Sequence, residues 1–418
     1  MSDTVQRIVK NTAFLTIAEV VTKGLSFVLI IIIARYLGDV GFGKYSFALA
    51  FTTLFSIFSD MGFSTLTIRE VARDKSLAQK YLNNGSFIKL ILSVITFVLI
   101  VILINVMKYP MDTILAVYIA GGYAIITSFN QFLRSIFRAF EKMEYEAFVR
   151  ISEILMIFAL VSASIYLKFG LMAILFCYLI GSMVRLLITV LIITANFVKP
   201  TFNVDLSFWK ESIKEALPFG ISGMFVLIYF KIDSVMLSIM KDDAVVGWYN
   251  AAYQLIFGLM IISTIIVGVI FPVMSKYHKD SKKSLKKVFT YASIILFVIS
   301  IPIVIIVYYF SNDIIISVYG VSYSESINAL KILIFVIPII FLTSLFGPTL
   351  ESMNKQRTVS IVAGSNAILN IILNYLLIPT YSYKGAAVAT VVTEALGLII
   401  MGFIIWNIFK RKKYDLME

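Results

Sequence analysis

The sequence predicts an all-α polytopic membrane protein, and three observations lead to this fold class. First, apolar residues make up 60% of the 418 residues and charged residues only 14%, whereas a soluble domain carries about 25% charged residues. Second, the apolar residues form continuous runs of about 20 residues or more, which cross a bilayer as helices rather than as barrel strands. Third, basic residues gather in alternate connections between these runs.

Twelve apolar runs predict twelve transmembrane helices. The first six are Thr12–Ala34, Phe42–Leu66, Phe87–Met107, Met111–Ile136, Ala147–Leu167 and Leu171–Asn196. The second six are Ala216–Met240, Ala244–Met274, Val288–Phe310, Ile327–Leu350, Val359–Ile378 and Gly385–Phe409. The longer runs fit a bilayer if the helix tilts or extends into the interface.

The distribution of basic residues predicts the orientation of these helices. Of the 36 lysines and arginines, 26 lie on one side, in connections or near helix ends, including Lys89, Arg134, Arg138 and Arg150, and six lie on the other. Basic loops remain in the cytoplasm, so we expect both termini there and the chain in the inner (cytoplasmic) cell membrane. The net charge of +12 is assigned to topology, and no nucleic-acid partner is expected.

Short sequence matches predict two six-helix lobes, related by a parallel pseudo-repeat around a central cavity. Gly43 and Tyr45 match Gly247 and Tyr249, and Glu141-Lys142 matches Asn354-Lys355. We expect an N-terminal lobe at residues 1–196, a basic cytoplasmic linker at 197–215 and a C-terminal lobe at 216–418.

Several kinds of chemistry are excluded by composition. The single cysteine (Cys177) and single histidine (His278) cannot form a disulfide, a Cys/His zinc site or a Ser-His-Asp triad. Gly38 to Lys44 matches the start of a phosphate-binding loop, but Tyr45 follows where Ser or Thr must hold magnesium. We therefore expect no metal and no cofactor.

Ionisable residues inside the predicted helices are the candidate functional residues, because each costs about 2.5–3.5 kcal/mol at a helix centre. Glu19 and Lys23 share a helix face, so they form either a neutral structural pair or a pair that lines the cavity. Lys231 and Asp233 point to different faces, so each needs another partner or water. We expect Lys231 to face the cavity, opposite Lys23.

Later helices carry further polar residues. Arg185 has no acidic neighbour in its own helix, so it either pairs with Glu153 of the preceding helix or lines the transport pathway. Glu394 lies in the middle of the last helix. A polar stripe recurs every four residues, at Asn366, Asn370 and Asn374. Interhelical hydrogen bonding explains this stripe at least as well as substrate contact.

The same stripe begins a block that resembles the signature of polysaccharide-transporter flippases, a branch of the multidrug/oligosaccharidyl-lipid/polysaccharide exporter superfamily. The block continues through Leu377-Ile-Pro379 and Tyr383-Lys-Gly385-Ala-Ala-Val-Ala-Thr390 to Glu394. Shorter matches are Ala34-Arg-Tyr-Leu-Gly38, Asp60-Met-Gly62 and Arg138-Ala-Phe-Glu-Lys142. The resemblance covers nearly the whole chain.

This resemblance implies a flippase that moves a polyprenyl-diphosphate-linked oligosaccharide from the cytoplasmic to the outer leaflet by alternating access, like the O-antigen and capsule flippases. Buried cations would compensate the diphosphate, and Lys23, Lys231 and Arg185 are the predicted substrate-binding residues. Predicted ion-coupling or polar cavity residues are Glu19, Asp233, Glu394, Asn366 and Asn370. Coupling to H⁺ or Na⁺, the membrane potential and product removal all stay open as driving forces.

Other functions remain in competition with this one. A cation-coupled multidrug exporter of the same superfamily would be expected to need acidic cavity residues. A peptidoglycan lipid flippase is similar to the oligosaccharide flippase proposed above, but it typically has fourteen spans. A membrane polymerase or ligase would be expected to carry a large outer loop, which this sequence lacks. A polysaccharide polymerase or glycosyltransferases are instead expected as partners.

Overall fold

The computed structural model describes residues 3–199, 201, 204–280 and 282–410. Three residues of the predicted linker (200, 202 and 203) and the last eight of the second predicted lobe (411–418) lie outside the described residues, as does the side chain of His278.

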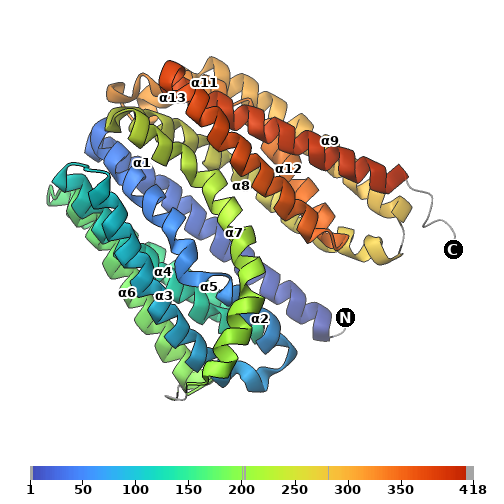
Figure 1. Cartoon of the computed structure of the whole chain (residues 1–418). Helices are drawn as coiled ribbons and strands as arrows, with labels where there is room; N and C mark the ends of the chain where they lie inside the picture. The colour runs from blue at the N-terminus through green and yellow to red at the C-terminus, as the bar shows by residue number, and fades with distance from the viewer. Residues whose placement is uncertain (1–2, 200, 202–203, 281, 411–418) are drawn as a thin grey trace. The chain divides into compact units, whose positions relative to one another are not determined.

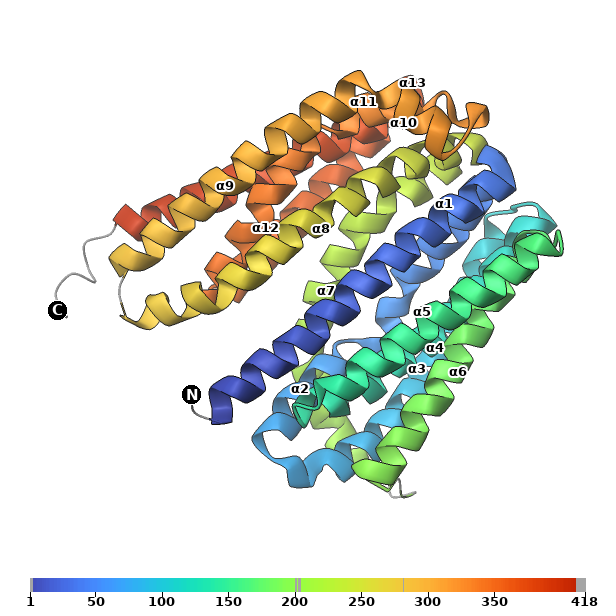
Figure 2. The same ribbon diagram turned by 180° about the vertical axis from the view of Figure 1, so that it is seen from behind.

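The described chain is helical almost throughout (Figures 1 and 2). Its α-helices are α1 (Asp3–Asp60), α2 (Phe63–Arg73), α3 (Ala78–Val106), α4 (Met111–Ala139), α5 (Met143–Tyr166), α6 (Leu171–Asn196), α7 (Leu206–Met240), α8 (Asp243–Asp280), α9 (Lys282–Tyr309), α10 (Ser311–Val318), α11 (Ser326–Leu333), α12 (Val336–Ser352) and α13 (Gln356–Lys410). Two short 3₁₀ helices are η1 (Lys75–Leu77) and η2 (Val321–Tyr323).

Most of these helices have the length and hydropathy of membrane spans. Within the described residues, nine helices are long and apolar enough to cross a bilayer, or ten if the bent pair α11 and α12 counts as one span. The polytopic, all-helical membrane fold predicted from composition is therefore confirmed.

Two of these helices are much longer than one crossing requires. Helix α1 has 58 residues and α13 has 55, which at 1.5 Å per residue is more than twice the hydrocarbon thickness of about 30 Å. Each contains one residue with non-helical backbone angles, Gly38 (φ 67°, ψ 178°) in α1 and Ser382 (φ 53°, ψ −139°) in α13. The ribbon of each helix turns back on itself, so each comprises two antiparallel arms (Figures 1 and 2).

The helices form two compact units, Met1–Val235 and Met236–Glu418. In the first unit, α4 packs against α1, α2, α3 and α6, and aromatic residues such as Phe63, Phe132 and Phe137 are fully buried among them. In the second unit, α12 packs against α8, α9 and α13. The boundary falls within α7, so most of the seventh predicted helix belongs to the first unit.

Two loops predicted to correspond have the same backbone conformation. Glu141 after α4 (φ 57°) and Asn354 after α12 (φ 59°) are both left-handed. Lys142 then donates its backbone N–H to the Phe137 carbonyl, and Lys355 donates to Leu350. Both helices therefore end in a Schellman motif at the matched positions.

The cytoplasmic linker proposed at 197–215 is partly helical, because α7 begins at Leu206. Asp205 caps this helix by accepting hydrogen bonds from the backbone N–H groups of Ser207 and Phe208. The Ser207 hydroxyl and the Lys80 ammonium also contact its carboxylate and hold the pKa of Asp205 well below its ordinary value. Trp209 donates from its indole to Asn84 on α3 at 3.0 Å.

Further along α7, its backbone closely approaches the chain between α1 and α2. Gly62 has a left-handed backbone (φ 83°), and a Cβ atom there would lie 2.4 Å from the Ala216 carbonyl oxygen and 2.5 Å from the Gly220 nitrogen. Only glycine permits both the conformation and the approach. The chain between α1 and α2 therefore rests directly on α7.

Three features of the fold are absent from the sequence prediction. The short helices α2 and α10 lie in segments that the prediction assigns to a helix end and to connections. The predicted tenth helix, Ile327–Leu350, is instead broken between α11 and α12, which meet at 47°. Pro338 lies in the first turn of α12, just past this bend, where a missing backbone N–H is tolerated.

Candidate functional site

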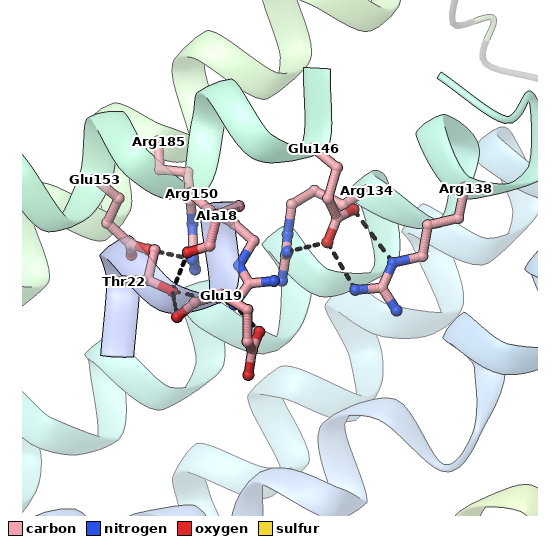
Figure 3. Close-up of polar contacts among 9 residues, drawn as sticks. All are labelled: Ala18, Glu19, Thr22, Arg134, Arg138, Glu146, Arg150, Glu153 and Arg185. Atoms are coloured by element: carbon pink, nitrogen blue, oxygen red, sulfur yellow. Dashed lines mark hydrogen bonds and ion pairs between the residues drawn. The ribbon is translucent and has the colours of Figure 1, made fainter. Parts of the chain in front are cut away.

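A cluster of charged side chains lies inside the first unit, where α1, α4, α5 and α6 pack together (Figure 3). The centre of the cluster is one face of α5, because Glu146, Arg150 and Glu153 follow each other at the helical spacings of four and three residues. Each of these three residues contacts an opposite charge on a neighbouring helix.

The predicted pair on α1 is present, and it has a third member. The Lys23 ammonium lies 2.9 Å from one carboxylate oxygen of Glu19. The Arg150 guanidinium lies 2.7 Å from the other oxygen and 3.3 Å from the Thr22 hydroxyl. One carboxylate therefore bridges two cations, and both Glu19 and Lys23 keep 33% of their side-chain surface exposed.

Arg185 on α6 forms an ion pair with Glu153, as one of the two sequence interpretations proposed. Both side chains are largely buried. Two guanidinium nitrogens of Arg185, Nε and Nη2, have no hydrogen-bond partner among the described residues. A buried guanidinium with open donors retains the capacity to bind an anion. Its predicted role in substrate binding stays a prediction.

Glu146 is the most buried acid of the cluster. Its side chain has 0% exposed surface, and its carboxylate lies 2.7 Å from Arg134 and 2.6 Å from Arg138, both on α4. The prediction counted these two arginines, and Arg150, on the cytoplasmic side. The structure places all three on membrane-spanning helices, in contact with buried or half-buried acids. Their charges contribute to packing as well as to any topological signal.

The cluster as a whole carries an excess of positive charge. Its basic members are Lys23, Arg134, Arg138, Arg150 and Arg185, and its acidic members are Glu19, Glu146 and Glu153. Such an arrangement favours an anionic ligand over a cationic one.

A second missed network lies where α1 ends. Lys89 on α3, which the prediction counted among the cytoplasmic-side charges, has a side chain with 0% exposed surface, and its ammonium lies 2.6 Å from Asp60. Ser128 on α4 accepts a further hydrogen bond from Lys89, and Ser64 donates to Asp60. The position of Lys89 inside the third predicted helix was the signal for this burial.

Lys231 and Asp233 on α7 differ in their surroundings, as their spacing predicts. Asp233 is buried. Lys231 is half-buried and forms no hydrogen bond or ion pair with any residue in the described ranges. A lysine in this setting is available to an added anion.

In the second unit the predicted polar stripe is buried on α13. Asn374 donates from its amide to the Asn370 carbonyl oxygen at 2.9 Å, which is a bond along the helix. Asn366 packs on Gly397, where a Cβ atom would lie 2.2 Å from the Asn366 amide nitrogen. Glu394 is also buried on the second arm, one turn after Thr390, which bonds the Tyr249 hydroxyl at 3.0 Å.

Neither unit contains an arrangement for metal chemistry within the described residues, where no three His, Cys, Asp or Glu side chains group as metal ligands. What the structure does contain is a bundle of membrane helices with paired and unpaired charges at their packing faces. Charged residues inside membrane helices are rare, and they typically face the interior of the bundle, where they pair with one another or line a polar pathway. A polytopic helical bundle with such charges is typical of the class of membrane transporters.

Comparison with known proteins identifies the family. Residues 8–278 match the polysaccharide biosynthesis protein family, and residues 218–376 match the MatE family. The chain belongs to the polysaccharide biosynthesis protein family, which confirms the predicted resemblance to polysaccharide transporters of the exporter superfamily.

Individual relatives agree with this assignment. The chain is 25% identical to the probable low-salt glycan biosynthesis flippase of Haloferax volcanii, over 94% of this chain and 82% of the relative. It is 22% identical to a capsular polysaccharide biosynthesis protein of Staphylococcus aureus, over 96% of this chain and all of the relative. The structure of a lipid II flippase in an inward closed conformation superposes with a TM-score of 0.79 at 16% identity, over 93% and 86% of the two chains.

Proposed function

We propose that this protein is a flippase that moves a lipid-linked oligosaccharide, carried on a polyprenyl diphosphate, from the cytoplasmic to the outer leaflet by alternating access. The observation that carries the proposal is the positive excess of the charged cluster in the first unit, with Lys23 partly exposed at its edge. The glycan-flippase and capsule relatives support the substrate class.

The physical need for these cations follows from the substrate. A diphosphate cannot enter hydrocarbon without compensation, because an isolated charge costs several kcal/mol even after local relaxation. Lys23, Lys231 and Arg185 would supply that compensation, since Lys23 is partly exposed, Lys231 has no partner among the described residues and Arg185 has open donors. The membrane potential, negative inside, favours outward movement of an anion by about 2.3 kcal/mol per charge per 100 mV.

The proposed topology has twelve spans in two six-helix lobes, with both termini in the cytoplasm of a cell (inner, cytoplasmic) membrane. The non-helical residues Gly38 and Ser382 support this count, because each divides one long helix into two spans. The matched Schellman motifs at Glu141 and Asn354 support the pseudo-repeat. So do the matched tyrosines: Tyr45 bonds Tyr178 on α6, and Tyr249 bonds Thr390 on the last arm.

Energy coupling and partners complete the proposal. Glu19, Asp233 and Glu394 are the acids that would carry H⁺ or Na⁺ if transport is ion-coupled, with Asn366 and Asn370 as polar lining. No cofactor is proposed. A polysaccharide polymerase or glycosyltransferases would consume or supply the lipid-linked glycan.

A cation-coupled multidrug exporter is the second candidate, favoured by the match of residues 218–376 to the MatE family. A drug cation would need an acidic site. The cluster in the first unit has the opposite charge balance, which is why we rank this function second.

The direct test is reconstitution into liposomes with a fluorescent polyprenyl-diphosphate sugar, with the outer-leaflet fraction measured by a membrane-impermeant quencher. We expect wild type to exchange the probe between leaflets. Lys23→Ala and Lys231→Ala should each insert into the membrane but translocate the probe much more slowly. Lys331→Ala, on the short helix α11, is the control lysine and should retain activity. Full activity in both Lys23→Ala and Lys231→Ala would disprove the cationic site.

A further inference from the structure

The acids of the charged cluster differ in how firmly they are held. Glu146 is fully buried between two arginines, and Glu153 is 12% exposed beside Arg185. Glu19 is 33% exposed, and its two oxygens face two different cations, Lys23 and Arg150. A buried ion pair is expensive to separate, whereas a solvent-accessible pair is worth only about 0–1 kcal/mol. Glu19 is therefore the acid of this cluster that another anion can displace most easily.

The spacing around Glu19 suits such an exchange. Lys23 and Arg150 contact different oxygens of the same carboxylate, at 2.9 and 2.7 Å. A phosphate group presents oxygens at similar spacing and accepts the same hydrogen bonds from an ammonium and a guanidinium. The Thr22 hydroxyl, 3.3 Å from Arg150, adds a polar group at the same place.

We propose that Glu19 is an internal competitor for the substrate: its carboxylate occupies the headgroup-binding cations Lys23 and Arg150 between transport cycles, and a phosphate of the incoming lipid displaces it. The inference rests on the proposed function and adds Arg150 to the site. When the headgroup leaves, Glu19 returns to both cations, so release does not leave two charges unpaired. The carboxylate thereby weakens binding and speeds release.

This role differs from a purely structural ion pair in the sign of its effect. If Glu19 only holds α1 on α5, then removing its charge weakens binding or leaves it unchanged. If Glu19 competes, then Glu19→Gln strengthens binding, because the amide keeps the shape of the side chain but no longer neutralises the cations. For a pair of this exposure, worth up to about 1 kcal/mol, we expect a gain of about twofold to fivefold in affinity.

The test uses purified full-length protein and farnesyl diphosphate as a short soluble probe, with farnesol as the uncharged comparison and calorimetry as the measurement. Glu19→Gln should bind the diphosphate about twofold to fivefold more tightly than wild type, and Glu19→Asp, which keeps the charge, should remain near wild type. The matched control is Glu144→Gln. This glutamate, on α5, is similarly exposed at 30%, but it lies 3.9 Å from a single lysine, Lys142, outside the cluster.

A second readout separates binding from turnover. In liposomes at saturating probe lipid, Glu19→Gln should translocate more slowly than wild type, because release becomes limiting. Unchanged or weaker binding in Glu19→Gln, while wild type binds the probe and Lys23→Gln loses it, overturns the competitor role and leaves the proposed function intact. If wild type shows no preference for farnesyl diphosphate over farnesol, both the competitor role and the cationic headgroup site are wrong.

Discussion

Removing the buried acid of the charged cluster should destabilise the first unit strongly. In Glu146→Leu the side-chain volume is nearly kept, but Arg134 loses its carboxylate at 2.7 Å while only 11% exposed. Coulomb's law at an effective dielectric constant of about 20 gives roughly 6 kcal/mol for that pair. Arg138 is 40% exposed and adds little, since water can replace the acid there. The desolvation cost of burying both ions offsets part of this Coulomb energy. We therefore expect the free energy of unfolding to fall by about 3–5 kcal/mol.

The assay is thermal denaturation of the purified protein in detergent. At about 2–4 °C per kcal/mol for a unit of this size, the midpoint should fall by roughly 6–20 °C. The double variant Arg134→Met with Glu146→Leu should recover most of the loss, because no unpaired buried charge remains. Glu144→Gln, 30% exposed on the same helix, should change the midpoint by less than about 4 °C. A Glu146→Leu midpoint no lower than that of Glu144→Gln would refute the reasoning.

Three further predictions follow from features outside this cluster. Lys89→Met should lower the free energy of unfolding by about 3–5 kcal/mol, because Asp60 loses its buried partner. Adding Asp60→Asn should restore most of the thermal midpoint. A double variant no more stable than Lys89→Met would contradict the pairing. Asp205 has a lowered pKa, so its contribution to folding is present above its unfolded pKa of about 4 and is lost as the pH falls through the lower folded value. The fluorescence of Trp209 in Asp205→Asn should therefore differ from wild type at neutral pH and converge with it in acid. Gly62→Ala should lower the thermal midpoint, because the new Cβ would lie 2.4 Å from a backbone oxygen, whereas Gly24→Ala, with nothing within 4 Å, should not.

The coarse fold was predictable because hydropathy depends on local sequence alone. The break at Gly38 falls between the first two predicted helices, and the break at Ser382 falls between the last two. The helix α2 and the bend between α11 and α12 were missed. Both involve tertiary contacts that local sequence does not encode: α2 packs on α4, and the two helices that meet at the bend both pack on α8 and α13.

The charged site was predictable only where its members are close together in the sequence. Glu19 and Lys23 are one helical turn apart, so their pairing could be read from spacing. Arg150 contacts Glu19 across 131 positions of sequence, and no local pattern contains that information. The prediction placed Glu153 inside its fifth helix and counted Arg150 among the cytoplasmic charges, but it did not consider Glu146, which lies one residue before that helix.

The charged face of α5 has a consequence for how the protein is made. Its three ionised side chains oppose insertion of an isolated helix, at up to about 2.5–3.5 kcal/mol each near the bilayer centre. Helix α4 emerges from the ribosome first and brings Arg134 and Arg138 to Glu146, but the partner of Glu153 is Arg185 on α6, which is synthesised later. Helix α5 is therefore expected to remain beside α4 in the insertion machinery until α6 arrives, and to enter the lipid with both neighbours.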